Sequence, residues 1–396
     1  MPQEVPTTQD APSASTNTAR TRTALIVGAS MAGLSAAAQL SAVGYRTTVV
    51  ERSPHLRLTG TPIDVRGEAL AVAGKMEILE DLRKNRVNSD ERPVFTTFVN
   101  ENGDAVAQLP LEMANDSDDD IEISREALIN ILHAKTDGTT EFVYRDWPVS
   151  ITDGETNVVV QFASGEQKTF DIVVGADGIH SSVRRLLIGP ESLYRKHLGV
   201  YYAIVDLPRS SKGISGESRT FNCPGRMVGI NDYGDRSFGV FAYRGPETEY
   251  DYRDTTAQKK LLIQAFEAEQ GWHIPFLLDA AWEASEIYFD SVSQVHMPRW
   301  SQGRVVLVGD AAHAASLFSG RGTSLAIMGA AILAEELHAS DHAHGVAFAR
   351  YESRLRPAVV KAQEGVLEAR DFMVPETQDQ IDERNRQFPL ISLPLA

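Results

Sequence analysis

Cysteine is nearly absent from this chain of 396 residues, which contains Cys223 alone. A single thiol cannot form an internal disulfide or a zinc site built from several thiolates, and such chains are typical of reducing compartments, so we expect a cytoplasmic protein without a metal site. Basic residues are also in the minority, because 38 lysines and arginines stand against 54 aspartates and glutamates and leave a formal charge of −16. Such a surface repels phosphate backbones and anionic lipids, which argues against nucleic acid as the main partner.

Long hydrophobic runs are missing as well. No stretch approaches the roughly 18 uncharged apolar residues of a membrane-spanning helix, so integral membrane association is not expected. Residues 1–22 are rich in Ser, Thr, Ala and Pro and lack the apolar core of a secretory signal, which predicts a disordered tail. A transit peptide is the alternative: Arg20 and Arg22 favour it, whereas Glu4 and Asp10 have the wrong charge for one.

The rest of the chain has an ordinary globular composition, with 42% hydrophobic and 23% charged residues. At about 150 residues per domain, its length suggests two or three globular units. The run TALIVGAS predicts a strand and a tight turn, a small-residue helix is expected over residues 31–43, and a second strand over residues 46–50. This order is typical of a βαβ unit in a parallel sheet.

The middle of the chain has a different pattern. Strands at residues 94–100 and 105–110 predict a hairpin outside the parallel sheet, and a second hairpin near residue 165 runs on into the apolar strand IVVGA. Ser124 can cap a helix over residues 125–135. Alternating, aromatic segments between residues 201 and 244 predict antiparallel strands, and a helix is expected over residues 255–269.

Parallel-sheet patterns return near the end, in GRVVLVGDAAH and the long helix that begins at TSLAIMGAAIL. We therefore predict an α/β fold with a discontinuous Rossmann-like domain, an inserted antiparallel β-sheet domain, and a C-terminal helix near residues 358–373 with a proline-containing tail. The expected boundaries are 23–75, 120–190 and 296–350 for the first domain, 76–119 and 191–295 for the insert, and 351–396 for the C-terminal helix and tail.

The first motif is a glycine-rich turn of the form G-x-G-x-x-G, with Gly28 and Gly33 at its ends and Ser30 in the middle glycine position. Such a turn lets the backbone approach a pyrophosphate at a helix N-terminus, and serine is small enough for the middle place. Glu51 follows at the end of the second strand, where a carboxylate can bind ribose hydroxyls. The alternative is an ordinary tight turn with a surface glutamate.

Two further motifs each follow a predicted strand. One is GADGIHSSVR, with Asp177, and the other is GDAAH, with Asp310, followed by GRGTS at the start of the long helix. An aspartate at such a place can bind a hydroxyl chain, and the helix start offers free N–H groups to an electron-rich ring. Taken singly, each aspartate can equally be a turn or cap residue.

Together these three motifs resemble those of the single-component FAD-dependent (class A) monooxygenases, which include p-hydroxybenzoate hydroxylase and tetracycline-inactivating enzymes. The resemblance covers about residues 23–375. It implies that the discontinuous domain binds FAD and that the insert binds substrate. It also implies that NADPH or NADH reduces the flavin and that dioxygen reacts through a flavin C4a-hydroperoxide. An aromatic or polyketide-like small molecule would be hydroxylated or receive an inserted oxygen.

The resemblance also implies roles for individual residues. Arg125 resembles a family arginine that contacts FAD, and Asp64 and Arg66 resemble flavin-proximal positions. Arg57 is a candidate NADPH contact, with a solvated surface arginine as the alternative. The implied cofactor-binding residues are Gly28, Ser30, Met31, Ala32, Gly33, Glu51, Arg52, Asp64, Arg66, Arg125, Asp177, Asp310, Gly320, Arg321, Gly322 and Thr323.

Other residues receive weaker assignments. Many relatives have proline in place of Leu317 and glutamine in place of Arg321, so Arg321 either stabilises a reduced flavin anion or pairs with a carboxylate. His180 and His313 are expected to make structural hydrogen bonds, and no side chain is assigned as a catalytic base. The substrate-pocket candidates, about half of which should face a ligand because strand residues alternate, are Phe221, Met227, Phe238, Phe241 and Tyr243.

Three alternative functions stay open at this point. A flavin reductase or a flavin-dependent halogenase has the same fold, and a non-catalytic protein with this fold can bind a prenyl or lipid ligand. The sequence does not decide the oligomeric state, the substrate, or whether the role is biosynthesis or antibiotic resistance.

Overall fold

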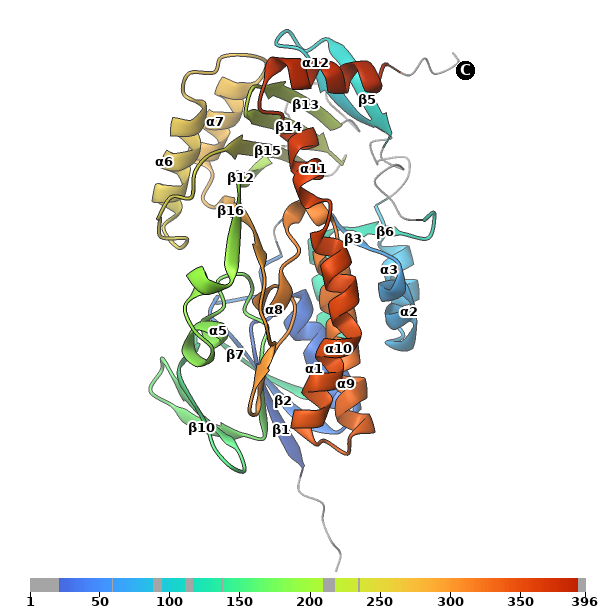
Figure 1. Cartoon of the computed structure of the whole chain (residues 1–396), viewed down its shortest axis with the longest axis vertical. Helices are drawn as coiled ribbons and strands as arrows, with labels where there is room; N and C mark the ends of the chain where they lie inside the picture. Colours follow the sequence, from blue (N-terminus) through green and yellow to red (C-terminus); the bar gives the residue numbers. More distant parts are fainter. Residues whose placement is uncertain are drawn as a thin grey trace, which may run out of the picture.

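The computed structural model describes residues 21–58, 60–87, 95–110, 117–136, 138–208, 218–233 and 236–390. Two large sheets lie at opposite ends of the long axis, with β1 and β2 in the lower half of Figure 1 and β13 to β15 in the upper half. The expected disordered tail lies outside the described residues, apart from Thr21 and Arg22. Among the helices of the described ranges, none is both long and apolar enough to cross a bilayer.

The lower sheet has six strands in the order β17-β18-β11-β1-β2-β7. Its members are β1 (Arg22–Val27), β2 (Tyr45–Glu51), β7 (Thr140–Tyr144), β11 (Ile172–Gly175), β17 (Ser301–Gln302) and β18 (Val305–Leu307). All neighbours pair in parallel except β17 and β18. Because β18 joins β11 from far along the chain, the predicted discontinuous parallel sheet is confirmed.

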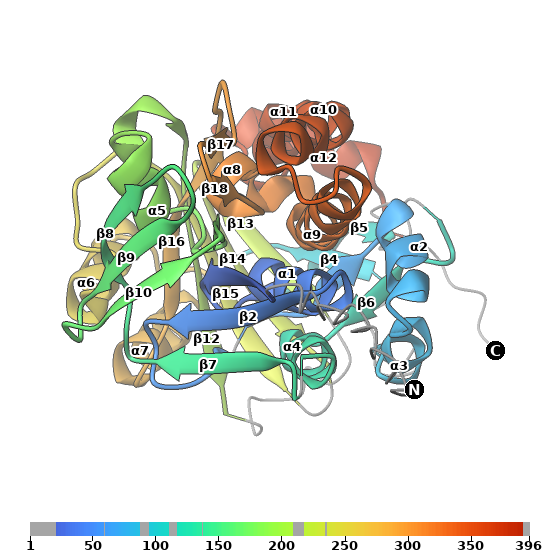
Figure 2. The same cartoon turned by 90° about the horizontal axis from the view of Figure 1, so that it is seen from below.

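Helices pack closely on this sheet because their contact residues are small. Gly33, Ala36 and Ala37 are buried on α1, and α9 is likewise rich in buried Ala and Gly. Figure 2 shows α1, α9 and α10 in succession on one side of β2. The helices of this half are α1 (Met31–Ala42), α2 (Glu68–Lys75), α3 (Leu79–Lys84), α4 (Arg125–Ala134), α5 (Ser182–Leu187), α8 (Asp310–His313), α9 (Gly322–Ala339) and α10 (His344–Gln363).

Short sheets complete the lower half. The hairpin predicted near residue 165 is confirmed as β9 (Val158–Phe162) and β10 (Gln167–Phe170), which form a three-stranded sheet with β8 (Pro148–Asp153). β3 (Ile63–Val65) pairs with β6 (Ile121–Ile123). The predicted cap of α4 is also confirmed, because the Ser124 hydroxyl oxygen accepts a hydrogen bond from the Ala127 N–H at 3.1 Å.

The upper sheet has seven strands in the order β16-β12-β15-β14-β13-β4-β5. Its members are β4 (Phe95–Val99), β5 (Ala105–Pro110), β12 (Arg195–Leu207), β13 (Ser218–Cys223), β14 (Arg226–Asp232), β15 (Ser237–Arg244) and β16 (Tyr288–Val295). It is antiparallel, as predicted, except where β4 and β13 pair in parallel. The predicted hairpin of β4 and β5 forms one edge.

The two faces of the upper sheet have different neighbours. Helices α6 (Thr255–Phe266) and α7 (Ile274–Glu283) cover one face, where Tyr201, Phe241 and Phe266 share a core. The other face, which we call the inner face, contributes Val200, Met227 and other residues to a second small core.

The expected C-terminal helix at residues 358–373 is wrong in its bounds. α10 continues through Pro357 to Gln363, because its buried Tyr351, Leu355 and Val359 hold it against the core. Gly365, with a φ of +69°, then separates it from α11 (Val366–Met373). The segment expected as a tail contains α12 (Gln378–Gln387), whose start has a capping box that this prediction overlooked.

The predicted domain boundaries stay a prediction. Ile78 and Leu82, which fall in the segment assigned to the insert, pack in the large core of the lower sheet. We therefore favour a first boundary nearer to β4 than to residue 76.

Candidate active site

The first glycine-rich turn joins β1 to α1. Gly28 has a φ of +103°, and a Cβ atom there would lie 2.6 Å from the Ala176 carbonyl oxygen. At Gly33, a Cβ atom would lie 1.8 Å from the Gly28 carbonyl oxygen. Both glycines are required for this close approach of turn, helix and β11, which is the geometry expected of a dinucleotide-binding turn.

The start of α1 and the end of β2 carry the next predicted residues. Ser30 is the N-cap of α1 and its side chain makes no capping hydrogen bond, so it leaves the first-turn N–H groups, including those of Met31 and Ala32, available to a ligand. The Glu51 carboxylate accepts a hydrogen bond from the Ala29 N–H at 2.9 Å. The acidic group is therefore held against the turn.

Arg52 lies beside Glu51 but contacts other residues. Its guanidinium carbon lies 5.3 Å from the centroid of the Trp147 ring. Burial raises the pKa of the Tyr252 phenol, but hydrogen bonds from Arg52 and Arg253 outweigh burial and lower that pKa. Arg52 thus links the end of β2 to the segment before α6, and a cofactor contact by Arg52 stays a prediction.

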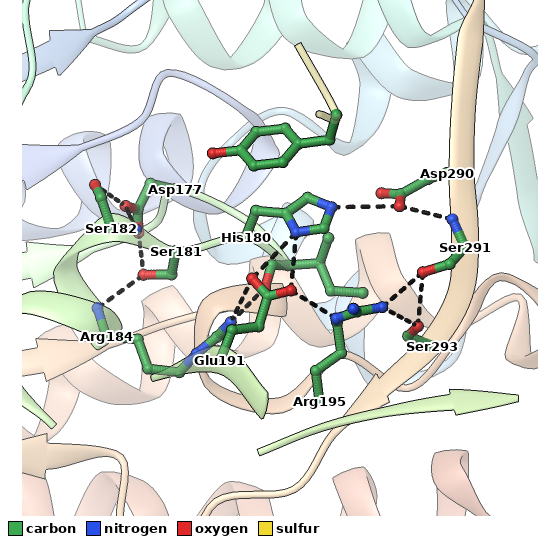
Figure 3. A network of polar contacts seen from close by, with 12 residues as sticks. Asp177, His180, Ser181, Ser182, Arg184, Glu191, Arg195, Asp290, Ser291 and Ser293 are labelled. Carbon is green, nitrogen blue, oxygen red and sulfur yellow. Dashed lines mark hydrogen bonds and ion pairs between the residues drawn. The ribbon is translucent and has the colours of Figure 1, made fainter. Parts of the chain in front are cut away.

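The second motif forms the start of α5 (Figure 3). The Asp177 carboxylate accepts hydrogen bonds from the Ser182 N–H at 2.6 Å and the Val183 N–H at 3.1 Å. The wholly buried Arg184 donates to the Ala311 carbonyl oxygen at 2.9 Å. Ser181 is the N-cap of α5, and Asp177 accepts hydrogen bonds from the next N–H groups of the helix, so the motif fixes the start of α5 beside Ala311. A cofactor contact by Asp177 stays a prediction.

Asp310 begins α8, directly after β18. The residue is exposed to solvent, yet burial by surrounding protein atoms raises the pKa of its carboxyl. The nearby positive charge of Arg125 opposes this rise. Half-buried Arg125 is itself desolvated, which lowers its pKa, while Tyr288 and Asp310 raise it. The charges of Arg125, Asp310 and Tyr288 act on one another, so the three residues lie close together, at a place that solvent reaches because Asp310 and Tyr288 are exposed. We call this place the recess.

The segment that contains Asp64 and Arg66 contacts the start of α9. The Arg66 guanidinium pairs with Asp64 at 2.7 Å, and the Arg66 N–H donates to the Ser324 Oγ at 2.9 Å. Gly320 has a φ of +61°, and a Cβ atom there would lie 3.7 Å from Arg66 Nη1. Residues far apart in the chain thus converge at one helix N-terminus.

The start of α9 has no capping hydrogen bond from the side chain of its N-cap residue. Arg321 is that residue, and Gly322 and Thr323 form the first turn. A Cβ atom at Gly322 would meet no heavy atom within 4 Å. The Arg321 side chain therefore leaves the first N–H groups of this long helix available to a ligand, with the positive end of the helix dipole behind them.

Arg57 lies apart from these groups. It is exposed and its Nε donates to the Ser53 Oγ at 3.2 Å. Burial is the largest cause of the lowered pKa of Arg125; Tyr288 raises this pKa, and the positive charge of Arg57 lowers it. Arg57 therefore lies near Arg125. Its exposure agrees with the surface-arginine alternative, and the NADPH contact stays a prediction.

Comparison with known proteins identifies the family. The family model described as "FAD binding domain" matches residues 21–365. The chain belongs to this FAD-binding family. A flavin-dependent monooxygenase from an unknown prokaryotic organism is 34% identical over 92% of this chain and 94% of its own. A flavin-dependent monooxygenase from Legionella longbeachae is 32% identical over 89% of this chain and 90% of its own. The predicted membership of the flavin-dependent monooxygenases is confirmed.

Solved structures agree with this assignment. Tetracycline destructase Tet(51) superposes with a TM-score of 0.81 at 29% identity, over 95% of this chain and 100% of that one. Tetracycline destructase Tet(55) superposes with a TM-score of 0.79 at 31% identity, over 93% of this chain and 94% of that one. Klebsiella pneumoniae HpxO, complexed with FAD and uric acid, shares the fold at 20% identity, with a TM-score of 0.68 over 92% of each chain.

The residues of this flavin-dependent monooxygenase fit FAD. The open helix N-termini of α1 and α9 suit anionic and electron-rich groups, and Glu51 offers an acceptor at the place expected for ribose hydroxyls. Arg125 and Asp310 add a cation and an acceptor in the recess. FAD is therefore the cofactor, and the individual contacts stay predictions.

The substrate-pocket candidates divide between the two faces of the upper sheet. Phe221, Phe241 and Tyr243 belong to the core beneath α6 and α7, and Phe241 is 0% exposed. Strand alternation places all three away from the inner face, and their part in a substrate pocket stays a prediction. Met227 packs in the inner-face core, and Phe238 follows the alternation of Val240 and Ala242 onto the same face.

Sequence reasoning missed two tyrosines of the inner face. Tyr202 on β12 and Tyr288 on β16 have ring centroids 6.5 Å apart, and Tyr288 is 51% exposed. Burial raises the pKa of both phenols. A period of two from Tyr288 through Asp290 to Val292 could have placed these residues on one sheet face, although it could not say which of the two faces.

The two histidines behave differently. The ring nitrogens of His180 lie 3.1 Å from Glu191 and 3.3 Å from Asp290, which confirms its structural hydrogen bonds (Figure 3). Burial lowers the pKa of His313 to about 4, and its ring packs 4.6 Å from that of Trp300. The hydrogen bond expected of His313 is not found at Nε2, which has no partner among the described residues.

Proposed function

We propose that this flavin-dependent monooxygenase uses NADPH or NADH and dioxygen to hydroxylate, or insert oxygen into, an aromatic or polyketide-like small molecule. The observation that supports the proposal is that Arg125 and Asp310 of the lower half lie close to Tyr288, whose ring contacts that of Tyr202 on the inner face of the upper sheet. Bound FAD would accept a hydride from the nicotinamide and activate dioxygen.

The residues of the chain would bind and orient the reactants. Arg66 and Asp64 brace the start of α9, and the open N–H groups there can stabilise negative charge on a reduced ring. The inner face supplies aromatic side chains from Tyr202 and Tyr288, which suit a flat, largely apolar substrate. No side chain is assigned as a base, because the cofactor supplies the reactive oxygen.

The similar proteins narrow the substrate class. The two tetracycline destructases named above, whose names give a polycyclic polyketide as their substrate, support a polycyclic or aromatic substrate. Either antibiotic modification or the tailoring of a secondary metabolite agrees with this class.

Isotope labelling tests the proposal. The holoenzyme is incubated with NADPH, heavy-isotope dioxygen and a panel of tetracyclines, other polycyclic polyketides and simple phenols, and products are analysed by mass spectrometry. The expected product carries one heavy oxygen atom, and its structure separates hydroxylation from insertion. NADPH oxidation without labelled product would favour the reductase alternative, and chloride-dependent product the halogenase. A protein that fails to take up FAD would favour a lipid-binding role.

Arg57 is proposed as a contact for NADPH. The change Arg57→Ala is expected to raise KM for NADPH about fivefold and KM for NADH little, because a guanidinium can pair with the 2′-phosphate that only NADPH carries. The matched control is Arg46→Ala, at another exposed arginine. Equal effects of Arg57→Ala on both nucleotides would contradict this role.

A further inference from the structure

His180 lies at a junction of four segments (Figure 3). It follows β11, its Nδ1 faces Glu191 at 3.1 Å, and its Nε2 faces Asp290 of β16 at 3.3 Å. The ring also stacks on Tyr252, with centroids 4.2 Å apart and planes 8° apart. The side chain is 17% exposed, so these partners rather than water determine its charge.

His180 is a cation at neutral pH. Burial disfavours the imidazolium, but the hydrogen bonds and charges of Asp290 and Glu191 outweigh burial and raise the pKa of His180 to about 9. Two other cations adjoin this network, because Arg195 contacts Glu191 at 2.6 Å and Arg184 lies 3.6 Å from it. Glu191 would therefore keep positive partners without His180.

Asp290 would not. Its other hydrogen bonds come from neutral donors, the Tyr250 hydroxyl at 3.2 Å and the Ser291 N–H at 2.7 Å. Within the described part of the chain, His180 is the one cation in ion-pair distance of Asp290. Asp290 also acts on the groups at the recess. Burial is the largest cause of the raised pKa values of Tyr288 and Asp310, and the negative charge of Asp290 raises both pKa values further. At Asp310 the positive charge of Arg125 opposes the rise.

We propose that His180 is a positioning residue that neutralises Asp290 and thereby limits the negative potential that the recess presents to FAD. The cofactor carries a negatively charged pyrophosphate and becomes more negative when its ring is reduced. An unpaired carboxylate at Asp290 would disfavour both states. The inference rests on the proposed function only in placing FAD beside Asp310.

Charge-matched variants test the proposal. His180→Gln retains hydrogen-bonding capacity but leaves Asp290 unpaired, and it is expected to weaken FAD binding about fivefold and to lower the midpoint potential of the bound flavin. The double variant His180→Gln with Asp290→Asn removes both charges and should restore FAD affinity to within about twofold of the original. A purely structural role predicts no rescue, since the second change removes a further native contact.

The pH dependence of the unsubstituted holoenzyme gives a second readout. FAD affinity, measured by flavin fluorescence, should fall as the pH rises through about 9, where His180 loses its proton. Glu191, Asp290, Arg184, Arg195 and Tyr252 also face this group, so His180→Gln, which should lack the pH-dependent fall, assigns it to His180.

Two results would overturn the inference: equal pH profiles in the original protein and His180→Gln, or a double variant no better than the single one. If Asp310→Ala still weakens FAD binding in that case, the proposed function survives and this inference alone fails. If FAD binds but no substrate is oxygenated, the proposed function fails instead.

Discussion

Some positions of this protein have no space for any side chain, and Gly33 is the clearest example. Gly33→Ala places a Cβ atom 1.8 Å from the Gly28 carbonyl oxygen, so the turn must shift or α1 must move. We expect a loss of about 2–4 kcal/mol in the free energy of unfolding. Gly345→Ala is the control, because a Cβ atom there meets nothing within 4 Å. Denaturant titration measures both, and equal stabilities would contradict the prediction.

Asp310 carries the second residue-scale prediction. Asp310→Ala removes the acceptor that lies beside Arg125 in the recess, so FAD retention should fall, with affinity about tenfold weaker. Flavin absorbance after gel filtration and a fluorescence titration measure the change. Asp279→Ala, at an exposed position of α7, should leave flavin content unchanged. Full occupancy in Asp310→Ala would remove Asp310 from the cofactor site.

At the scale of elements, α12 is attached to the upper sheet through one buried arginine. Arg384 lies 3.7 Å from the centroid of the Phe98 ring, and its guanidinium donates to the Asn222 side-chain oxygen at 2.8 Å. Burial lowers its pKa to about 10, so it stays charged at neutral pH. The helix therefore depends on a desolvated cation that aromatic rings and amide oxygens hold in place.

Removing that cation should loosen α12. Arg384→Ala is expected to lower the free energy of unfolding by about 2–4 kcal/mol, because it leaves a cavity and unpaired buried acceptors. Arg386→Ala on the same helix, where the side chain is 72% exposed, should change it by less than about 0.5 kcal/mol. Urea titration compares them, and a similar small effect of both would show that α12 does not need Arg384.

Elements also show what local sequence can predict. The cap of α4 at Ser124 and the hairpin of β4 and β5 were predictable, because each depends on neighbours in the chain. The C-terminal helices were not. α10 continues through Pro357 since tertiary packing of Tyr351 and Leu355 outweighs the local cost of proline.

For the whole molecule, the His180 network joins the lower sheet to the upper one and makes stability depend on pH. The pKa of His180 is raised from 6.5 to about 9, so its protonated form favours the folded state. This contribution is fully present below pH 6.5 and is lost as the pH rises through about 9. The melting temperature should fall over that range and fall less in His180→Gln, and parallel curves would contradict the prediction.

The sequence by itself determined the motifs whose chemistry is local: the glycine turn at Gly28, the acidic residue Glu51 at the end of β2, and the two aspartates that follow strands. Only the tertiary structure decided what each faces. It placed Asp177 against the first N–H groups of α5 and Asp310 close to Arg125, and it put Phe241 and Met227 on opposite faces of the upper sheet. The reason is physical, since short-range sterics and capping specify a turn, whereas a facing partner depends on how distant strands pair and pack.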